Sequence, residues 1–266
     1  MNGRNVPMAI SSILLFMAQN VNAAPSGGEA QYEHCLSRAA SNPADALREA
    51  ADWQKAGGGP AADHCAAVAL VGLHRYVEAA NSLETLAHGR FPTDPGMRRA
   101  LYDQAGNAWL LAGKPDNAIG SFSAALAIDP SDEDILSDRA RADAMKKNWA
   151  AAESDLSAAL LVNPDRADLL VLRGSARHAL GRKKDALADY ELALKLRPGL
   201  VDALVERGNM KYEAGDLAGA RADWTQIVAI SPLSSAADSA RQQLAATAGA
   251  APPINATTPS KPRKSR

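Results

Sequence analysis

The sequence predicts an all-helical protein built from repeated helix pairs, and three observations lead to this expectation. Of the 266 residues, 47% are hydrophobic but only 5% are aromatic, so the core must consist mainly of alanine and leucine. These residues are strong helix formers, and they favour closely packed helices over a sandwich or a barrel. Prolines recur with a spacing of 34 residues, and glycines and alanines recur in phase with them. We therefore expect one helical unit to be repeated along the chain.

The first 23 residues have the pattern of a secretory signal peptide. Arg4 gives a positive start, an apolar stretch covers about residues 6–18, and the small Ala23 ends a suitable cleavage site. The apolar stretch is short for a transmembrane helix, and no cysteine for lipid attachment follows it directly. We expect cleavage after Ala23 and a periplasmic or secreted protein. Membrane association is expected only if the signal stays uncleaved.

The chain contains two cysteines, Cys35 and Cys65, and each follows a histidine. An even number of cysteines in an exported chain predicts one disulfide. Free thiols are one alternative, and a metal site with His34 and His64 is another. Neighbouring residues on a helix point in different directions, so two adjacent histidine–cysteine pairs are poor tetrahedral ligands. We therefore expect a disulfide, with no metal and no other cofactor.

The repeat is clearest over residues 99–232, where four segments of 34 residues align without a gap. Positions 8 and 20 are small, position 24 is large and position 32 is proline. In that order, the residues are Gly106, Ala140, Gly174 and Gly208; Ala118, Ala152, Ala186 and Ala220; Phe122, Leu156, Tyr190 and Trp224; and Pro130, Pro164, Pro198 and Pro232. Gly113, Gly181 and Gly215 mark a turn between two helices in three segments. This pattern resembles the tetratricopeptide repeat family.

The resemblance implies a right-handed superhelical stack of helix–turn–helix units, an alpha-alpha solenoid, with a groove lined by the first helix of each unit. It is strong over about half the chain. A weaker resemblance predicts diverged repeats over residues 29–96, in which the disulfide would join consecutive first helices. After the repeats we expect a capping helix over residues 233–247, and then a disordered basic tail over residues 248–266. The apolar stripe of the capping helix consists of Leu233, Ala237, Ala240 and Leu244.

Arginine at position 7 and aspartate at position 23 occur together in three of the four segments. The pairs are Arg139 with Asp155, Arg173 with Asp189, and Arg207 with Asp223. Both are absent from the first segment, which has Ala105 and Ser121 instead. We expect an ion pair between the two helices of each unit, because a buried arginine needs a carboxylate partner. The alternative is a ladder of arginines that bind a ligand.

The resemblance also implies that positions 2, 5, 6, 9, 12 and 13 face the groove. In this sequence these positions include Asp103, Asn107, Asp134, Asp138, Arg141, Asp168, Ser175, His178, Asp202, Glu206, Asn209, Tyr212 and Glu213. Because most of the charged residues are acidic, the expected partner is a protein or peptide with a basic or polar extended segment. The alternative is that the acids only solvate exposed helix faces near helix starts.

No motif indicates catalysis, since a phosphate-binding glycine loop, a histidine-rich metal spacing and a Gly-x-Ser-x-Gly elbow are all missing from the sequence. Without the signal segment the chain has 28 basic and 30 acidic residues; the tail carries +4 and the remainder −6. Nucleic acid is therefore not an expected partner. We expect a protein–protein interaction scaffold of the bacterial periplasm or cell envelope rather than an enzyme. The alternative is an inner-membrane-tethered assembly factor, or a chaperone-like subunit of an envelope enzyme.

Overall fold

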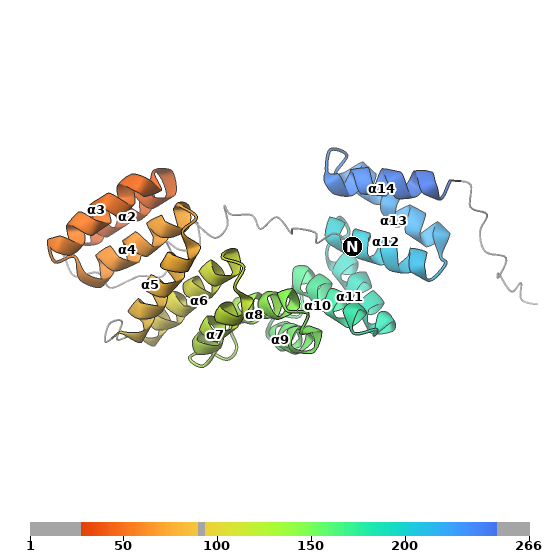
Figure 1. The fold of residues 1–266 in the computed structure, drawn as a ribbon. Coiled ribbons are helices and arrows are strands. Elements are labelled where there is room, and N and C mark those ends of the chain that lie inside the picture. The colour runs from red at the N-terminus through yellow and green to blue at the C-terminus, as the bar shows by residue number, and fades with distance from the viewer. Residues whose placement is uncertain (1–27, 90–93, 249–266) are drawn as a thin grey trace, which may run out of the picture. The chain divides into compact units, whose positions relative to one another are not determined.

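The computed structural model describes residues 28–89 and 94–248, which form helices joined by short turns and contain no strand (Figure 1). Within each part of the chain, successive helices pack against each other as hairpins. The predicted all-α architecture of stacked helix–turn–helix units is therefore confirmed. No helix in the described ranges is long and apolar enough to cross a membrane. The predicted signal peptide, and the predicted tail beyond Ala248, lie outside the described residues.

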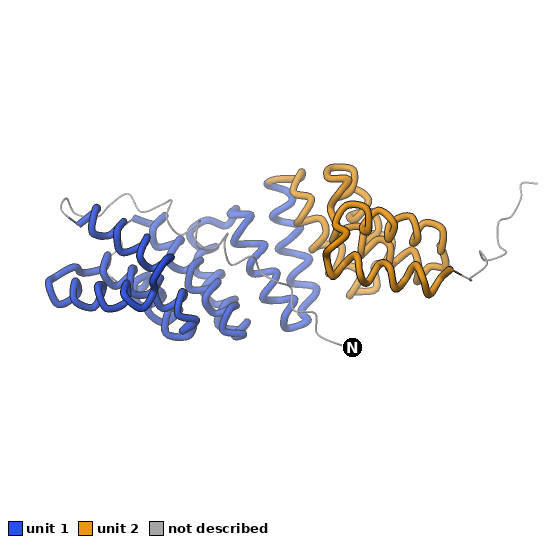
Figure 2. The backbone as a smooth tube through the Cα atoms, turned by 90° about the horizontal axis from the view of Figure 1, so that it is seen from above, with its two compact units in different colours: residues 1–162 blue, residues 163–266 orange. Residues whose placement is uncertain are grey.

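The chain divides into two compact units, residues 1–162 and residues 163–266 (Figure 2). The boundary falls inside the predicted block of four regular segments, four residues before the end of the second segment at residue 166. The regularity of the sequence across this point gives no sign of such a division.

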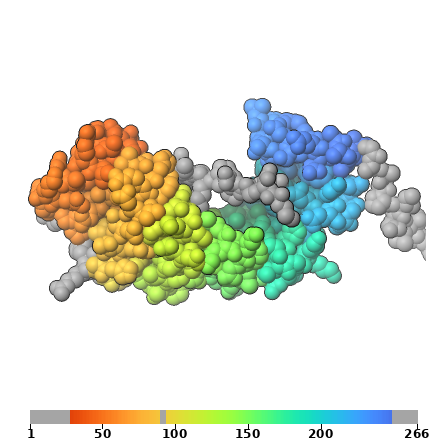
Figure 3. Space-filling view, in the orientation of Figure 1, coloured from red at the N-terminus to blue at the C-terminus, as the bar shows by residue number. Residues whose placement is uncertain are grey.

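Unit 1 consists of four helix pairs in its described part. They are α2 (Glu29–Ser41) with α3 (Pro43–Lys55), α4 (Gly59–Gly72) with α5 (Tyr76–His88), α6 (Pro95–Leu111) with α7 (Pro115–Leu126), and α8 (Glu133–Met145) with α9 (Trp149–Val162). The pairs follow one another in chain order in the space-filling view (Figure 3). First helices of consecutive pairs contact each other, α2 with α4 and α6 with α8.

Unit 2 has two further pairs and a final helix. They are α10 (Ala167–Ala179) with α11 (Lys183–Leu196), α12 (Val201–Glu213) with α13 (Leu217–Ile230), and the single α14 (Ser235–Ala246). Helix α14 buries Ala237 and Ala240 against the preceding pair. The prediction that Leu233 belongs to this apolar stripe is wrong, because its side chain is 98% exposed. Ser234 caps the helix after it, so Leu233 precedes the first turn.

Local sequence signals explain where the helices begin. Asp94 accepts a hydrogen bond from the backbone N–H of Met97 at 2.7 Å, and Pro95 occupies the first helical position of α6. Such a cap satisfies a free N–H group, and proline has none to lose. Helix α6 therefore begins four residues before Arg99, where the repeat alignment places the first segment.

The close approach of paired helices depends on a small residue facing a large one. A Cβ atom on Gly106 would lie 2.5 Å from Phe122, and one on Gly174 would lie 2.6 Å from the Tyr190 ring. Both rings are fully buried. Position 8 of the segment is therefore small because the ring at position 24 occupies the space where a side chain would go.

The disulfide lies in the N-terminal part of unit 1. Cys35 on α2 is bonded to Cys65 on α4, with 6.1 Å between their Cα atoms. The bond joins two consecutive first helices, as the weak resemblance implies, and it leaves no free thiol or cysteine metal site there. The adjacent His64 is buried, and burial lowers its pKa. Its neutral ring accepts from the Tyr32 hydroxyl and donates to Gln104 Oε1, at 2.5 and 2.7 Å.

Candidate interaction surface

The three predicted ion pairs are present, and each is bidentate. The nitrogen–oxygen distances are 2.7 and 2.8 Å for Arg139 with Asp155, 3.0 and 2.7 Å for Arg173 with Asp189, and 3.0 and 2.6 Å for Arg207 with Asp223. All three aspartates are buried. These arginines are therefore held inside the helix pairs, which favours the structural role over the ligand-binding ladder.

A second basic group, which the sequence reasoning missed, joins the two ion pairs of unit 2 from one helical turn further on. Arg177 donates to Asp189 at 2.8 Å, and Lys211 donates to Asp223 at 3.0 Å. The corresponding residue of the preceding segment is the acid Asp143, whose pKa is raised by burial and by nearby Asp155. A basic residue four positions after the arginine was the signal that could have revealed this contact in unit 2.

The first segment replaces the ion pair by a contact to the preceding helix pair. Glu84 on α5 accepts hydrogen bonds from Ser121 Oγ at 2.6 Å and from the Trp109 indole at 3.0 Å. The joint loss of arginine and aspartate in this segment thus coincides with a different polar partner. Its carboxylate comes from outside the 34-residue segment, so the internal alignment could not predict it.

Five of the predicted groove residues lie together in unit 1, and we call them the acidic face. They are Asp103 and Asn107 on α6, and Asp134, Asp138 and Arg141 on α8. The Asn107 amide donates to Asp103 Oδ1 at 3.1 Å and also bonds Asp138. Arg141 pairs with Asp138 within the same helix. The Asn107 amide therefore joins carboxylates from two helices, and the charge of Asp134 acts on both of them.

Acids outnumber bases among the five residues of this face, with three aspartates and one arginine. Burial, together with the nearby charges of Asp138 and Asp134, raises the pKa of Asp103 to about 7, although Arg99 opposes the shift. Burial raises the pKa of Asp138 as well, although Arg141 opposes the shift. Arg99 is shared with Asp132, to which it forms an ion pair. An added cation would therefore relieve repulsion between carboxylates.

The predicted groove residues of unit 2 do not form a comparable acidic cluster. His178 lies 3.5 Å from Glu213, which also accepts from Lys183 at 2.9 Å. Tyr212 is 46% exposed, and its ring packs 5.7 Å from that of Trp224. These contacts link α10, α11, α12 and α13 and mix acidic, basic and aromatic groups.

The remaining predicted residues of unit 2 have separate surroundings. Asp168 is held by Arg166 at 3.0 Å and lies 4.0 Å from Arg197. The Ser175 hydroxyl bonds the Val171 carbonyl and the Tyr190 hydroxyl, so it belongs to helix packing. On α12, Asp202 is exposed, while Glu206 and Asn209 are half-buried. Among the residues that the structure describes, no group of histidine, cysteine and acidic side chains could hold a metal ion.

Comparisons with known proteins agree with the repeat geometry. The family model of the tetratricopeptide repeat matches residues 110–175, which run from the end of α6 into α10. The chain is a tetratricopeptide repeat protein. No curated protein sequence matches it.

Solved structures of tetratricopeptide proteins resemble the chain at low sequence identity. A crystal structure of MamA is 18% identical, with a TM-score of 0.55 and coverage of 62% of this chain and 93% of MamA. MamA from Desulfovibrio magneticus RS-1 is 17% identical over 73% of this chain and 98% of its own, with a TM-score of 0.54. The first tetratricopeptide domain of human RPAP3 is 30% identical over 46% and 96%, with a TM-score of 0.44. The MamA structures support the fold.

Proposed function

We propose that this tetratricopeptide protein is an interaction scaffold, and that the acidic face of unit 1 binds a basic extended segment of another polypeptide. One observation carries the proposal: Asp103, Asp134 and Asp138 approach one another on two packed first helices, and the pKa of Asp103 is raised to about 7. A site that holds like charges together is less favourable when empty than when a cation occupies it.

A lysine or arginine side chain fits this site better than a metal ion does. The Asn107 amide N–H group donates to the Asp103 carboxylate, and Arg141 already pairs with Asp138. The face is therefore only partly anionic. Extended basic peptides spread their charges along a helix surface and gain affinity from several weak contacts. Because α6 and α8 are consecutive first helices, one segment can contact both. The acids then act as more than solvating groups at helix starts.

The test measures the binding of fluorescently labelled peptides to the mature chain, residues 24–266, by fluorescence anisotropy. A peptide of alternating lysine and glycine should bind, and counterparts with glutamine or glutamate in place of lysine should not. Replacing Asp103, Asp134 and Asp138 by asparagine should weaken binding by at least roughly tenfold, which corresponds to about 1.4 kcal/mol. Binding should also weaken as salt rises, because exposed charges are screened.

A matched control changes the net charge equally at exposed acids elsewhere. It carries Asp165→Asn, Asp185→Asn and Glu191→Gln, all at exposed residues of unit 2. This variant should bind the lysine peptide as the unmodified chain does. Equal affinity of the acidic-face variant and the control, or equal binding of the glutamate peptide, would contradict the proposal.

We further propose that the protein acts in the bacterial periplasm or cell envelope. The signal-like residues 1–23 support this location, and so does the disulfide, because disulfides persist mainly in oxidising compartments. Sequencing the N-terminus of the protein isolated from cells tests it. A chain that starts at Ala24 agrees with export, whereas a retained Met1 would favour the inner-membrane-tethered assembly factor.

A further inference from the structure

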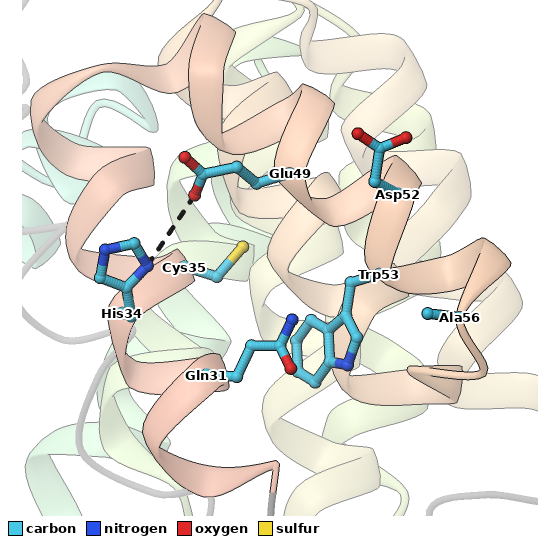
Figure 4. A pocket seen from close by; sticks show the side chains of 7 residues that line it. All are labelled: Gln31, His34, Cys35, Glu49, Asp52, Trp53 and Ala56. Atoms are coloured by element: carbon cyan, nitrogen blue, oxygen red, sulfur yellow. Dashed lines mark ion pairs between the residues drawn. The ribbon is translucent and has the colours of Figure 1, made fainter.

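A second site lies at the opposite end of unit 1 from α8 (Figure 1). There a cavity of about 440 Å³ opens between α2 and α3 (Figure 4). Gln31 and His34 on α2 line it together with Glu49, Asp52 and Trp53 on α3. No residue of the acidic face takes part. A volume of this size accommodates a side chain with its flanking backbone.

The cavity combines an aromatic surface with carboxylates. The six-membered ring of Trp53 lies toward Gln31, and the Glu49 carboxylate lies on the other side of the cavity, near His34 (Figure 4). The opposite edge of the indole packs over Gly58, where an added Cβ would lie 2.6 Å from the ring. The backbone at Gly58 therefore helps to hold Trp53 in place.

The carboxylates can accept another cation. Glu49 Oε1 accepts from Arg38 at 3.0 Å, while Oε2 lies 3.8 Å from the His34 ring. Asp52 pairs with Lys55 at 2.9 Å, but both side chains are more than three-quarters exposed. Exposed pairs contribute little to stability and exchange readily, and a carboxylate has about four acceptor positions.

We propose that this cavity binds the guanidinium group of an arginine side chain from a partner polypeptide. The planar guanidinium stacks on an indole face while its N–H groups donate to a carboxylate at the edge, which an ammonium group cannot do equally well. Glu49 is the carboxylate that faces the cavity beside Trp53. The site is separate from the acidic face and does not depend on the function proposed for it.

The test uses the full mature chain and the indole N–H signals in a nitrogen-15 NMR spectrum. The sequence has four tryptophans, so Trp53→Phe assigns the relevant signal. The probes are three blocked tripeptides, with arginine, lysine or citrulline between two glycines; citrulline is nearly isosteric with arginine but uncharged. The arginine peptide should shift the Trp53 signal and bind roughly three- to tenfold more tightly than the lysine peptide. The citrulline peptide should bind at least about tenfold more weakly than arginine.

Variants distinguish this site from the acidic face. Glu49→Gln should weaken binding of the arginine peptide roughly threefold or more. Trp53→Leu should weaken it by a similar factor; because this variant lacks the indole signal, its binding is measured by calorimetry. The triple asparagine variant of the acidic face should retain the Trp53 response. The proposal would be overturned if the arginine peptide did not shift the Trp53 signal, or if the citrulline peptide bound as tightly as the arginine peptide. Tighter binding of the lysine peptide would also overturn it, and so would loss of the Trp53 shift in the acidic-face variant but not in Glu49→Gln. Unchanged thermal unfolding of Glu49→Gln would show that its effect does not arise from misfolding.

Discussion

Replacing Gly174 by alanine tests whether helix spacing in each unit is set by the pair of residues at positions 8 and 24. The added Cβ would lie 2.6 Å from Tyr190 Cε1 and 3.0 Å from two further ring atoms. Because this ring is fully buried, it cannot move aside without disturbing its neighbours. Overpacking of this kind lowers the free energy of unfolding by about 1–3 kcal/mol. Alanine in a helix raises it by about 1 kcal/mol relative to glycine. We therefore expect Gly174→Ala to lower the free energy of unfolding by up to about 2 kcal/mol.

The chain supplies both a control and a rescue. Gly120 lies in α7, and a Cβ there would meet nothing within 4 Å, so Gly120→Ala should gain about 1 kcal/mol. The second segment already combines Ala140 with a smaller residue at position 24, Leu156. In a Tyr190→Leu background, Gly174→Ala should therefore become neutral or stabilising, with a coupling of about 1–3 kcal/mol. Urea unfolding of the four variants measures this cycle. Equal stability changes for Gly174→Ala and Gly120→Ala would refute the reasoning.

Four further predictions concern stability and pH. Lys147 has a φ of 62° at the turn where three other segments place glycine, and Lys147→Gly should stabilise the chain by up to about 1 kcal/mol in urea unfolding. Asp189→Asn should lower the free energy of unfolding by about 3–5 kcal/mol, because it leaves Arg173 and Arg177 without their shared carboxylate. A smaller loss of stability than that of the exposed control Asp185→Asn would contradict this. Reducing the disulfide, which closes a separation of 30 residues, should cost about 3–4 kcal/mol, and a double serine variant should unfold at the same lowered temperature. Because the folded-state pKa of Asp103 is raised to about 7, the folded state binds more protons than the unfolded state from about pH 4 to 7, and its stability should fall as pH rises through that range; calorimetry of Asp103→Asn should show a smaller fall.

The sequence was most informative where packing repeats. Glycine at position 8, the aromatic residue at position 24 and the arginine–aspartate pairs recur at fixed spacing, so their contacts could be inferred from one unit and transferred to the others. The same reasoning failed where a contact crosses from one segment to another. Glu84 reaches Ser121 from the preceding helix pair, and periodicity within a segment contains no information about that contact.

The candidate binding residues were predictable only in part. The repeat register placed Asp103 and Asp138 on the same face, but their mutual repulsion depends on the distance between α6 and α8, which composition does not give. Ser175 occupies a predicted groove position, yet the hydroxyl of Tyr190 is close enough to bond it. The cavity beside Trp53 lies in the diverged repeats, where the alignment is weakest and gives no register for comparison.

A selection from a random peptide display library on the immobilised mature chain tests the central claim most directly. The selection is carried out in parallel on the triple asparagine variant of Asp103, Asp134 and Asp138. We predict that the unmodified chain enriches peptides rich in lysine and arginine, and that the variant loses those that bind the acidic face. Enrichment of acidic or purely apolar peptides, or identical basic peptides with identical affinities on both proteins, would contradict the assignment of this face as the binding surface.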